Sequence, residues 1–145
     1  MGGFYMYSYS KSARYVNFIF AIILFLLCIF MRLEVWYNIV IGFVGLIILK
    51  DAVKEWGATF ELKGDRMVVR SRDKVIREIT YREMKYLTIT RKNKKWVVIA
   101  DDDRILFTIK PKIENHEEMV SKLIELNKSN KKLDIHDYIK KTYKK

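Results

Sequence analysis

Two histidines and a run of three aspartates are the side chains best suited to chemistry, and their spacing supports no catalytic site. His116 lies in the predicted start of a helix and His136 in the C-terminal tail, and neither belongs to a zinc-protease, thiol-redox or phosphate-loop motif. Asp101–Asp103 could hold a cation, but no further ligand follows at the spacing of a calcium loop. We therefore expect no catalysis, no cofactor and no metal.

The basic residues offer a different chemistry, the binding of phosphate. The chain has 28 lysine and arginine residues against 17 acidic ones, a formal net charge of +11. Such a charge suits contact with a nucleic-acid backbone, but no nucleic-acid-binding motif or exposed aromatic platform accompanies it. Nucleic acid is therefore not an expected partner.

Two apolar runs near the N-terminus indicate that the chain is attached to a membrane. Tyr15–Met31 contains no charge over seventeen positions, and Ile39–Leu49 follows after seven residues. The first run is at the lower limit of length for a membrane span, and the second becomes long enough if its helix includes Trp36 and Trp56. These tryptophans also suit the aromatic belts of a membrane interface. We expect a two-helix transmembrane hairpin over residues 15–56.

Two other interpretations of these runs are weaker. Buried helices of a soluble domain would need more apolar surface to cover them than the rest of the chain provides. A cleaved signal peptide would need a small-x-small site, which Ile29–Arg32 does not supply. The single Cys28 lies inside the first run, which excludes a disulfide and leaves either a small apolar side chain or a site of acylation.

The distribution of positive charge predicts the orientation of the hairpin. All but three of the 28 lysine and arginine residues follow the second run, while the connecting loop contains one Arg32 against Glu34. By the positive-inside rule, the N-terminal segment (1–14) and the chain after the hairpin lie in the cytoplasm. We expect a multi-pass protein of the inner (plasma) membrane with both termini cytoplasmic.

After residue 57 the apolar residues alternate with polar ones, which is typical of strands. Six short segments have this pattern: residues 59–63, 66–70, 74–81, 85–91, 95–100 and 104–110. The expected inward side chains are Phe60 with Leu62, Val75 with Ile79, Leu87 with Ile89, and Ile105 with Phe107 and Ile109. Six strands at about ten-residue spacing predict a small antiparallel barrel or sandwich.

A helix and a basic tail follow the strands. Asn115 is a suitable N-cap ahead of acidic residues, in the manner of a capping box. Apolar residues then recur at helical spacing: Met119, Val120, Leu123 and Ile124. This helix should close an α+β domain over residues 57–128. For the tail, residues 129–145, two interpretations remain: a short amphipathic helix on the membrane surface, with Asp134 as its cap, or a solvated chain end.

This order of elements resembles that of the bacterial pleckstrin-homology-like membrane proteins over residues 15–128. RILFTIK, then Pro-Lys, then ENHEEMVSKLIEL resembles the family's last strand, its exit and its final helix, and ITYREMKYLTI resembles the step between two of its strands. The resemblance implies a seven-stranded pleckstrin-homology-like barrel closed by a C-terminal helix and a membrane-associated, non-enzymatic role. Only six strands can be placed here, and Lys110 precedes Pro111 where an apolar residue is commoner.

Lys63 followed by Arg70-Ser71-Arg72 fits the phosphoinositide-binding pattern of pleckstrin domains. Basic residues are frequent enough here for a chance match, and Arg70 and Arg72 fall at the far end of their strand. The first and third hairpin turns, where the family resemblance implies ligand binding, would point away from the bilayer. A protein partner or a second copy of the chain is therefore the more suitable occupant of those turns.

The strand order also predicts which turns face the membrane. The first strand begins directly after the second span, so every second connection of an up-and-down sheet returns to the membrane side. These connections have a net charge of +8 and contain Arg70, Arg72, Lys74, Arg91, Lys92, Lys94, Lys95, Lys110 and Lys112. The opposite connections have a net charge of −1 and contain Lys63, Asp65, Arg66, Arg82, Glu83, Asp101, Asp102, Asp103 and Arg104. We expect the first set to contact anionic inner-leaflet lipids, the alternative being that the turns are basic only because they are solvated.

The sequence therefore predicts a two-span membrane protein whose cytosolic domain is a non-catalytic binding or scaffolding module. Two other functions remain open. One is a small immunity or resistance protein that protects the membrane against a pore-forming peptide. The other is an accessory subunit of a membrane complex, for which Asn17 and Asn38, at the ends of the spans, are the only candidate polar contacts.

Overall fold

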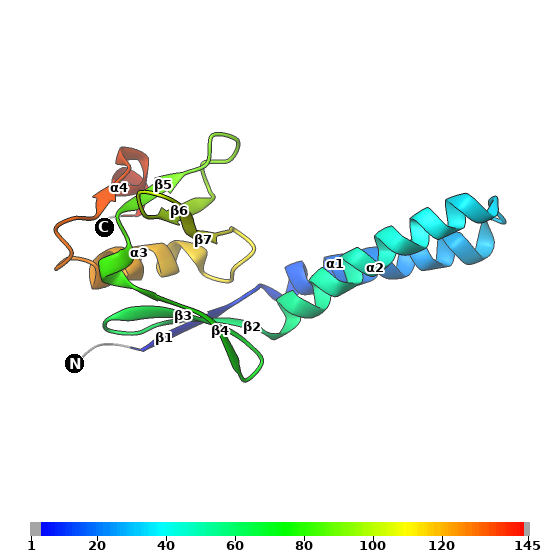
Figure 1. The fold of residues 1–145 in the computed structure, drawn as a ribbon, viewed down its shortest axis with the longest axis horizontal. Coiled ribbons are helices and arrows are strands. Elements are labelled where there is room, and N and C mark those ends of the chain that lie inside the picture. The colour runs from blue at the N-terminus through cyan, green and yellow to red at the C-terminus, as the bar shows by residue number, and fades with distance from the viewer. Residues whose placement is uncertain (1–3, 144–145) are drawn as a thin grey trace. The chain divides into compact units, whose positions relative to one another are not determined.

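The computed structural model describes residues 4–143, and the chain divides into two compact units (Figure 1). The β domain consists of Met1–Ser8 and Thr59–Lys145, and the hairpin unit consists of Tyr9–Ala58. The β domain is therefore discontinuous, because the hairpin is inserted between its first strand and the rest. The sequence predicts a domain of residues 57–128 alone, and the structure adds the N-terminal segment and the tail to it.

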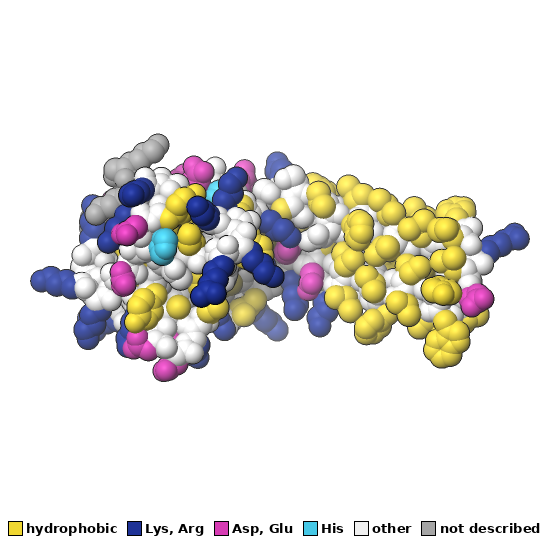
Figure 2. Space-filling view, turned by 90° about the horizontal axis from the view of Figure 1, so that it is seen from above, with side chains coloured by type: hydrophobic (Ala, Val, Ile, Leu, Met, Phe, Trp, Pro, Cys, Tyr) yellow, Lys and Arg dark blue, Asp and Glu magenta, His cyan; other side chains and the backbone are white. Residues whose placement is uncertain are grey.

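Two long apolar helices form the hairpin unit: α1 (Lys11–Phe30) and α2 (Val35–Gly57). Ser10 begins α1 by accepting a hydrogen bond from the backbone N–H of Ala13 at 3.3 Å. Both helices are long and apolar enough to cross a membrane. Most of their large apolar side chains are exposed, and Figure 2 shows hydrophobic side chains over much of the visible hairpin surface. Helices of a soluble core would be mostly buried, so this finding favours membrane spans.

Small residues form the seam between α1 and α2. The buried positions are Ala21 of α1 and Gly45 and Ala52 of α2. A Cβ atom at Gly45 would lie 3.2 Å from Cζ of Phe25, so any larger residue would require the Phe25 ring to move by a few tenths of an ångström. At the base of the hairpin, Asn17 donates a 2.9 Å hydrogen bond to the carboxylate of Glu55. This hydrogen bond joins the two helices of the hairpin.

The first sheet contains a strand that the sequence pattern does not reveal. Its order is β1 (Tyr5–Ser8), β2 (Ala58–Leu62), β3 (Arg66–Ser71) and β4 (Lys74–Thr80). β1 pairs antiparallel with β2, with Tyr7 opposite Phe60 and Ser8 opposite Thr59. Four residues are too few to show alternation clearly, and their partner strand follows only after the complete hairpin.

The second sheet has the order β7 (Ile105–Ile109), β6 (Val97–Ala100), β5 (Tyr86–Ile89) and β8 (Asp134–Ile135). A 3₁₀ turn, Tyr81–Glu83, connects β4 to β5. The six predicted strands are thus all present, and the domain is of the α+β class. The two sheets remain separate and do not close into a barrel. At the open seam, the Arg77 guanidinium on β4 donates a hydrogen bond to the Leu106 carbonyl on β7.

β-Bulges explain why two predicted core residues are exposed. Phe60, Leu62, Ile79, Leu87 and Ile109 are buried as expected, whereas Val75 is 44% exposed and Ile105 is 63% exposed. The register between β3 and β4 shifts at Val69/Arg70, and that between β6 and β7 shifts at Ile99/Ala100. Each shift inserts one residue and reverses the faces of the residues beyond it. Val75 and Ile105 therefore lose the inward position that strict alternation would give them.

Helix α3 (His116–Leu126) packs its apolar face into the β domain, and its four predicted apolar residues are all buried. It also contacts β1, where the Tyr7 hydroxyl donates to the Glu118 carboxylate at 3.2 Å. Asn115 occupies the N-cap position, as predicted, but the predicted capping box is wrong. Asn115 has a left-handed conformation, with φ of 56°, and its side chain makes no cap hydrogen bond.

Both interpretations of the tail are wrong, because it folds into the β domain. β8 extends the second sheet parallel to β5, and α4 (Asp137–Tyr143) buries Ile139 and Tyr143. Asp134 is not a helix cap, since its backbone N–H bonds to the Lys85 carbonyl at 2.8 Å. The tail therefore packs against α3 and β5.

Candidate functional site

Three connections of the β domain lie at the end where β1 stops and β2 begins (Figure 1). We call this the near end; it comprises the β3–β4, β5–β6 and β7–α3 connections. The backbone N–H of Glu114, in the β7–α3 connection, donates a 2.9 Å hydrogen bond to the carbonyl of Ser8, the last residue of β1. The opposite, far end comprises the β2–β3, β4–β5 and β6–β7 connections. The predicted alternation of turns between two ends is therefore the arrangement within this domain.

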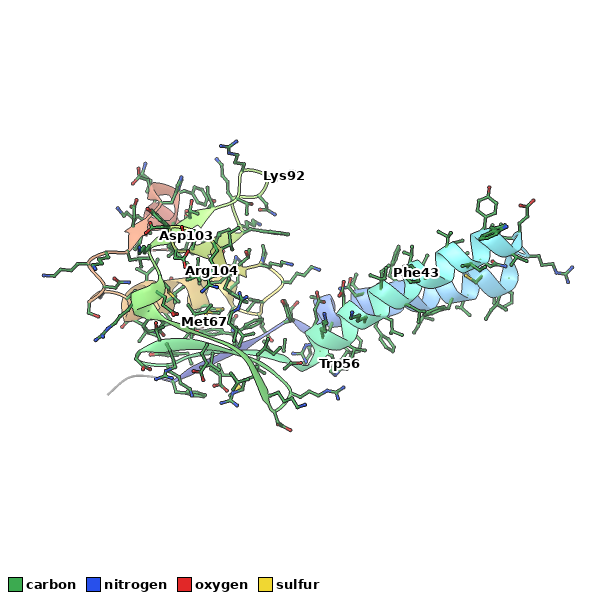
Figure 3. The ribbon with its side chains drawn as sticks, viewed as in Figure 1. Phe43, Trp56, Met67, Lys92, Asp103 and Arg104 are labelled. Carbon is green, nitrogen blue, oxygen red and sulfur yellow. The ribbon has the colours of Figure 1, made fainter. Side chains whose placement is uncertain are left out.

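Most cations of the near end have no acidic partner. Arg72 and Lys74 of the β3–β4 connection are exposed, as are Arg91, Lys92 and Lys95 of the β5–β6 connection. Within residues 4–143, no carboxylate lies at ion-pair distance from any of these five. Lys92 projects outward from its loop (Figure 3). Unpaired, solvated cations keep their full charge available for an anionic surface.

Two further lysines of the near end lie over aromatic rings. Lys94 Nζ is 5.6 Å from the ring centre of Tyr138 on α4, and Lys110 Nζ is 5.2 Å from that of Trp96. Such contacts orient the ammonium group without neutralising it. The sequence showed no signal for these pairs, because Tyr138 reaches the loop only through the folded tail. Lys112, the remaining predicted residue of this connection, is exposed.

Arg70 does not belong with the other near-end cations. Its Nε lies 3.0 Å from the Glu61 carboxylate, and the Glu61 side chain is only 9% exposed. The two residues lie on the face of the first sheet that is opposite to Phe60, since Glu61 pairs with Met6 and Phe60 with Tyr7. The predicted lipid contact of Arg70 is therefore better described as a structural ion pair within the sheet.

Most charges in the far-end connections are paired with one another. Arg66 lies 2.9 Å from Asp65 and 3.2 Å from Glu78, and Arg104 lies 3.5 Å from Asp101. Further groups of this end are also engaged: Lys63 lies 4.0 Å from Glu61, Lys85 bonds to Asp102, the Tyr86 hydroxyl donates to Asp102, and Glu83 accepts from the backbone N–H of Thr80. Arg82 and Asp103 are exposed (Asp103 is labelled in Figure 3).

The aspartate run stabilises a turn. Asp101 accepts hydrogen bonds from the backbone N–H groups of Asp103 at 2.9 Å and Arg104 at 2.8 Å. These backbone bonds lower the pKa of Asp101, and the ammonium group of Lys85 lowers that of Asp102. In the described part of the chain, no cluster of three potential metal ligands occurs.

Burial perturbs two further titratable residues. Desolvation raises the pKa of the Tyr7 phenol, next to Glu118, and lowers the pKa of His116 at the start of α3. A groove of about 750 Å³ between α3, β8 and α4 is lined by Asn127, Ile135 and Tyr143 among others. None of its lining residues forms a nucleophile–base pair.

Comparisons with protein-family models, with curated proteins and with solved structures found no match to this chain. The candidate site therefore rests on its own geometry: a set of exposed, unpaired cations at the end of the β domain where the chain passes to the apolar helices.

Proposed function

We propose that this chain is a two-span membrane protein whose β domain is a non-catalytic binding module that docks on anionic lipids of the cytoplasmic leaflet. The observation that carries the proposal is the concentration of unpaired cations at the near end. Both segments that connect to the hairpin also leave the domain at that end, through Ser8 and Thr59.

The pairing of β1 with β2 supports an even number of spans. These strands precede and follow the hairpin, yet their residues are direct neighbours in one sheet. If α1 and α2 cross a bilayer, both ends of the hairpin must therefore lie on the same side of it. The excess of lysine and arginine in the β domain favours the cytoplasmic side.

The arrangement of strands also supports a pleckstrin-homology-like module. The resemblance in sequence implies seven strands and a closing helix, and β1 supplies the strand that could not be placed. Seven antiparallel strands, β1 to β7, are followed by α3. The open seam between the two sheets is a departure from a closed barrel.

Electrostatics gives the expected strength of docking. A cation near an anionic leaflet contributes about 1 kcal/mol, and the attraction falls off within a Debye length of roughly 8–10 Å at physiological salt. Among residues 4–143, seven near-end cations have no carboxylate at ion-pair distance: Arg72, Lys74, Arg91, Lys92, Lys94, Lys95 and Lys110. Asp73 is the only acidic residue within the β3–β4 turn. The near end can therefore hold the domain on lipid even though each contact is weak.

Full-length protein in nanodiscs tests the proposal, because β1 is needed to complete the domain. In a Cys28→Ala background, a fluorophore is attached at Lys92→Cys for the near end or at Asp103→Cys for the far end. Spin-labelled head groups then quench the fluorophore where it lies at the bilayer surface. We expect quenching of the near-end label in discs that contain phosphatidylserine, weaker quenching in phosphatidylcholine alone, and little quenching of the far-end label in either.

Equal quenching at the two positions, or quenching that ignores the lipid charge, would contradict electrostatic docking. Recovery of the unlabelled protein in the soluble fraction after alkaline extraction of membranes would contradict the two spans themselves. The two parts of the proposal are thus tested separately.

A further inference from the structure

The β3–β4 hairpin is exposed at the end that carries its turn. In β4 only Ile79 is buried, and residues 74–78 are all exposed. The partner strand β3 contributes three residues to the core: Met67, Val68 and Val69. The turn that joins the two strands, Arg72-Asp73, projects from the sheet (Figure 1). The half of β4 next to the turn is therefore accessible to a surface outside the domain.

Two consecutive apolar side chains lie on this exposed half of β4. Val75 is 44% exposed and Ile76 is 65% exposed. Consecutive residues of a regular strand point to opposite faces, so one of the two would normally point inward. Val69 pairs with Arg77 and Arg70 pairs with Val75, which leaves Ile76 as the extra residue of a β-bulge. The bulge therefore accounts for two adjacent apolar side chains that both face solvent.

The turn next to them contains two cations and a backbone conformation that is unusual for arginine. Arg72 has a φ of 56°, in the left-handed region. Two-residue hairpin turns usually have Gly, Asn or Asp where φ is positive, because a larger side chain is unfavourable there. An unfavourable conformation at an exposed turn indicates a function for the side chain. Within residues 4–143, neither Arg72 nor Lys74 has a carboxylate at ion-pair distance.

The other strongly exposed isoleucine of the β domain has the opposite surroundings. Ile105 on β7 is 63% exposed, and it follows the acidic turn Asp101–Asp103. Arg104, the cation beside it, already lies 3.5 Å from Asp101. An anionic surface would repel this turn, whereas it would attract Arg72 and Lys74. Apolar exposure and free positive charge thus coincide at the β3–β4 turn and not at Ile105.

We infer that the β3–β4 hairpin inserts Val75 and Ile76 into the interfacial layer of an anionic bilayer. The inference rests on the proposed docking through the near end, to which it adds a hydrophobic contribution. Segments that lie on a membrane surface combine lysine and arginine with large apolar side chains, which reach the boundary between head groups and acyl chains. The long side chains of Arg72 and Lys74 can hold their charges at the level of the phosphates while their apolar neighbours lie deeper.

This hydrophobic contribution differs from the electrostatic one in its response to salt. Added salt screens the attraction between exposed cations and anionic lipids. It does not screen the burial of apolar surface, which depends on the area removed from water. Docking should therefore keep a salt-resistant part, and that part should depend on Ile76.

Variants of the two exposed isoleucines test the inference in full-length protein. The protein, in a Cys28→Ala background, is placed in nanodiscs that contain phosphatidylserine, and a fluorophore at Lys92→Cys reports docking by quenching from spin-labelled head groups. Ile76→Gln should lower the docking equilibrium constant by about five-fold, because an apolar side chain no longer leaves water. The factor should be similar with and without added salt. Ile105→Gln, the control with matched exposure, should change docking by less than about two-fold. Thermal unfolding checks that each variant folds.

A depth measurement gives a second readout. With spin labels on the acyl chains instead of the head groups, a fluorophore at Ile76→Cys should be quenched more than one at Lys92→Cys, and one at Ile105→Cys should be quenched little. Docking of Ile76→Gln that equals that of the parent, while Lys92→Cys is still quenched by head groups, overturns the insertion alone and leaves the turn as a contact for protein. Equal losses in the two isoleucine variants also overturn it. Absence of head-group quenching at Lys92→Cys in the parent overturns the proposed docking and the insertion together.

Discussion

Both ends of the β domain contain basic residues, but these are mostly paired with acidic residues at the far end and mostly unpaired at the near end. At the far end, Arg66, Lys85 and Arg104 each have an aspartate or glutamate partner. At the near end, Arg91 and Lys92 have none among the described residues, although the same strands lead to both ends. The difference lies in how the charges are paired.

A cation that is already paired with a carboxylate binds an external anion less favourably than an unpaired cation does. A cation held by a carboxylate already has a favourable neighbour and must lose it before it can bind phosphate. An unpaired cation keeps that binding energy available, at the cost of repulsion from its neighbours within one loop. Four basic residues in the five positions Arg91–Lys95 repel one another in solution and gain more from an anionic surface.

The largest expected effect comes from removing those four charges. Substitution of Arg91, Lys92, Lys94 and Lys95 by glutamine should lower the docking equilibrium constant in phosphatidylserine discs by about 10²–10³, at roughly 1 kcal/mol for each cation. The measurement is quenching by spin-labelled head groups of a fluorophore at Arg72→Cys, another near-end position. Added salt should weaken docking of the unsubstituted protein in the same assay.

A far-end variant provides the matched control. Substitution of Arg82, Arg104, Lys131 and Lys132 by glutamine removes the same number of charges; Arg82, Lys131 and Lys132 line one groove at that end, and Arg104 lies in its β6–β7 connection. Docking should change by less than about two-fold, because the proposed docking through the near end would place these positions farther from the leaflet than a Debye length. If both variants lose docking equally, only the total charge matters and the distinction between the ends fails.

The second prediction concerns Arg70, which lies toward the near end yet is paired. Arg70→Gln should leave docking nearly unchanged and destabilise the β domain by about 2 kcal/mol, because the almost buried Glu61 would keep only the longer ion pair to Lys63. Chemical denaturation of the full-length protein in micelles measures the loss. The double variant Glu61→Gln with Arg70→Gln should regain part of it, whereas loss of docking without loss of stability would place Arg70 among the lipid contacts.

The sequence predicts the difference between the near and far ends only in part. The alternating pattern from residue 58 onward is strong enough to place β2 to β7, and antiparallel connections then sort the turns between two ends. The partner of Arg70 is not visible, because Glu61 lies nine positions earlier on a neighbouring strand. The β-bulges that expose Val75 and Ile105 are also invisible, since a one-residue shift leaves no mark on composition.

Long-range pairing explains the other differences. β1 is short and pairs with residues that follow the whole hairpin, so the pattern of apolar residues around it does not predict a strand. β8 is two residues long and joins the second sheet only because Ile139 and Tyr143 hold the tail against α3 and β5. Tyr138 consequently reaches Lys94, a contact that neither interpretation of the tail allowed.

A smaller effect is expected at the far end from Asp102→Asn. This change removes the ion pair to Lys85 and the acceptor of the Tyr86 hydroxyl. These groups are exposed, so the unfolding temperature should fall by a few degrees at most. Lys85 lowers the pKa of Asp102, and the carboxylate therefore contributes stability above the ordinary pKa of an aspartate, which is lost as the pH falls through the lowered value. The variant should show a flatter decline of stability in acid; a decline as steep as that of the parent would mean that the pair has no stabilising role.

The smallest expected effect returns to the near end, at His116, where α3 begins. Burial lowers the pKa of this imidazole, with opposing influence from Glu117 and a further lowering by Lys95. The unfolded chain then binds the proton more readily than the folded one, so stability should fall as the pH decreases through the ordinary histidine value of about 6.5, until the lowered value is passed. His116→Gln should remove this slope between pH 7.5 and 5.5 in thermal unfolding. Removing the charge of Lys95 by Lys95→Gln should raise the pKa of His116 toward its ordinary value and therefore reduce this slope. Anionic lipid at the near end should also raise the pKa of His116, because a negative surface favours the imidazolium form. If discs with and without phosphatidylserine give the same His116 titration by NMR, the near end does not approach the leaflet closely enough for its unpaired cations to be the docking surface.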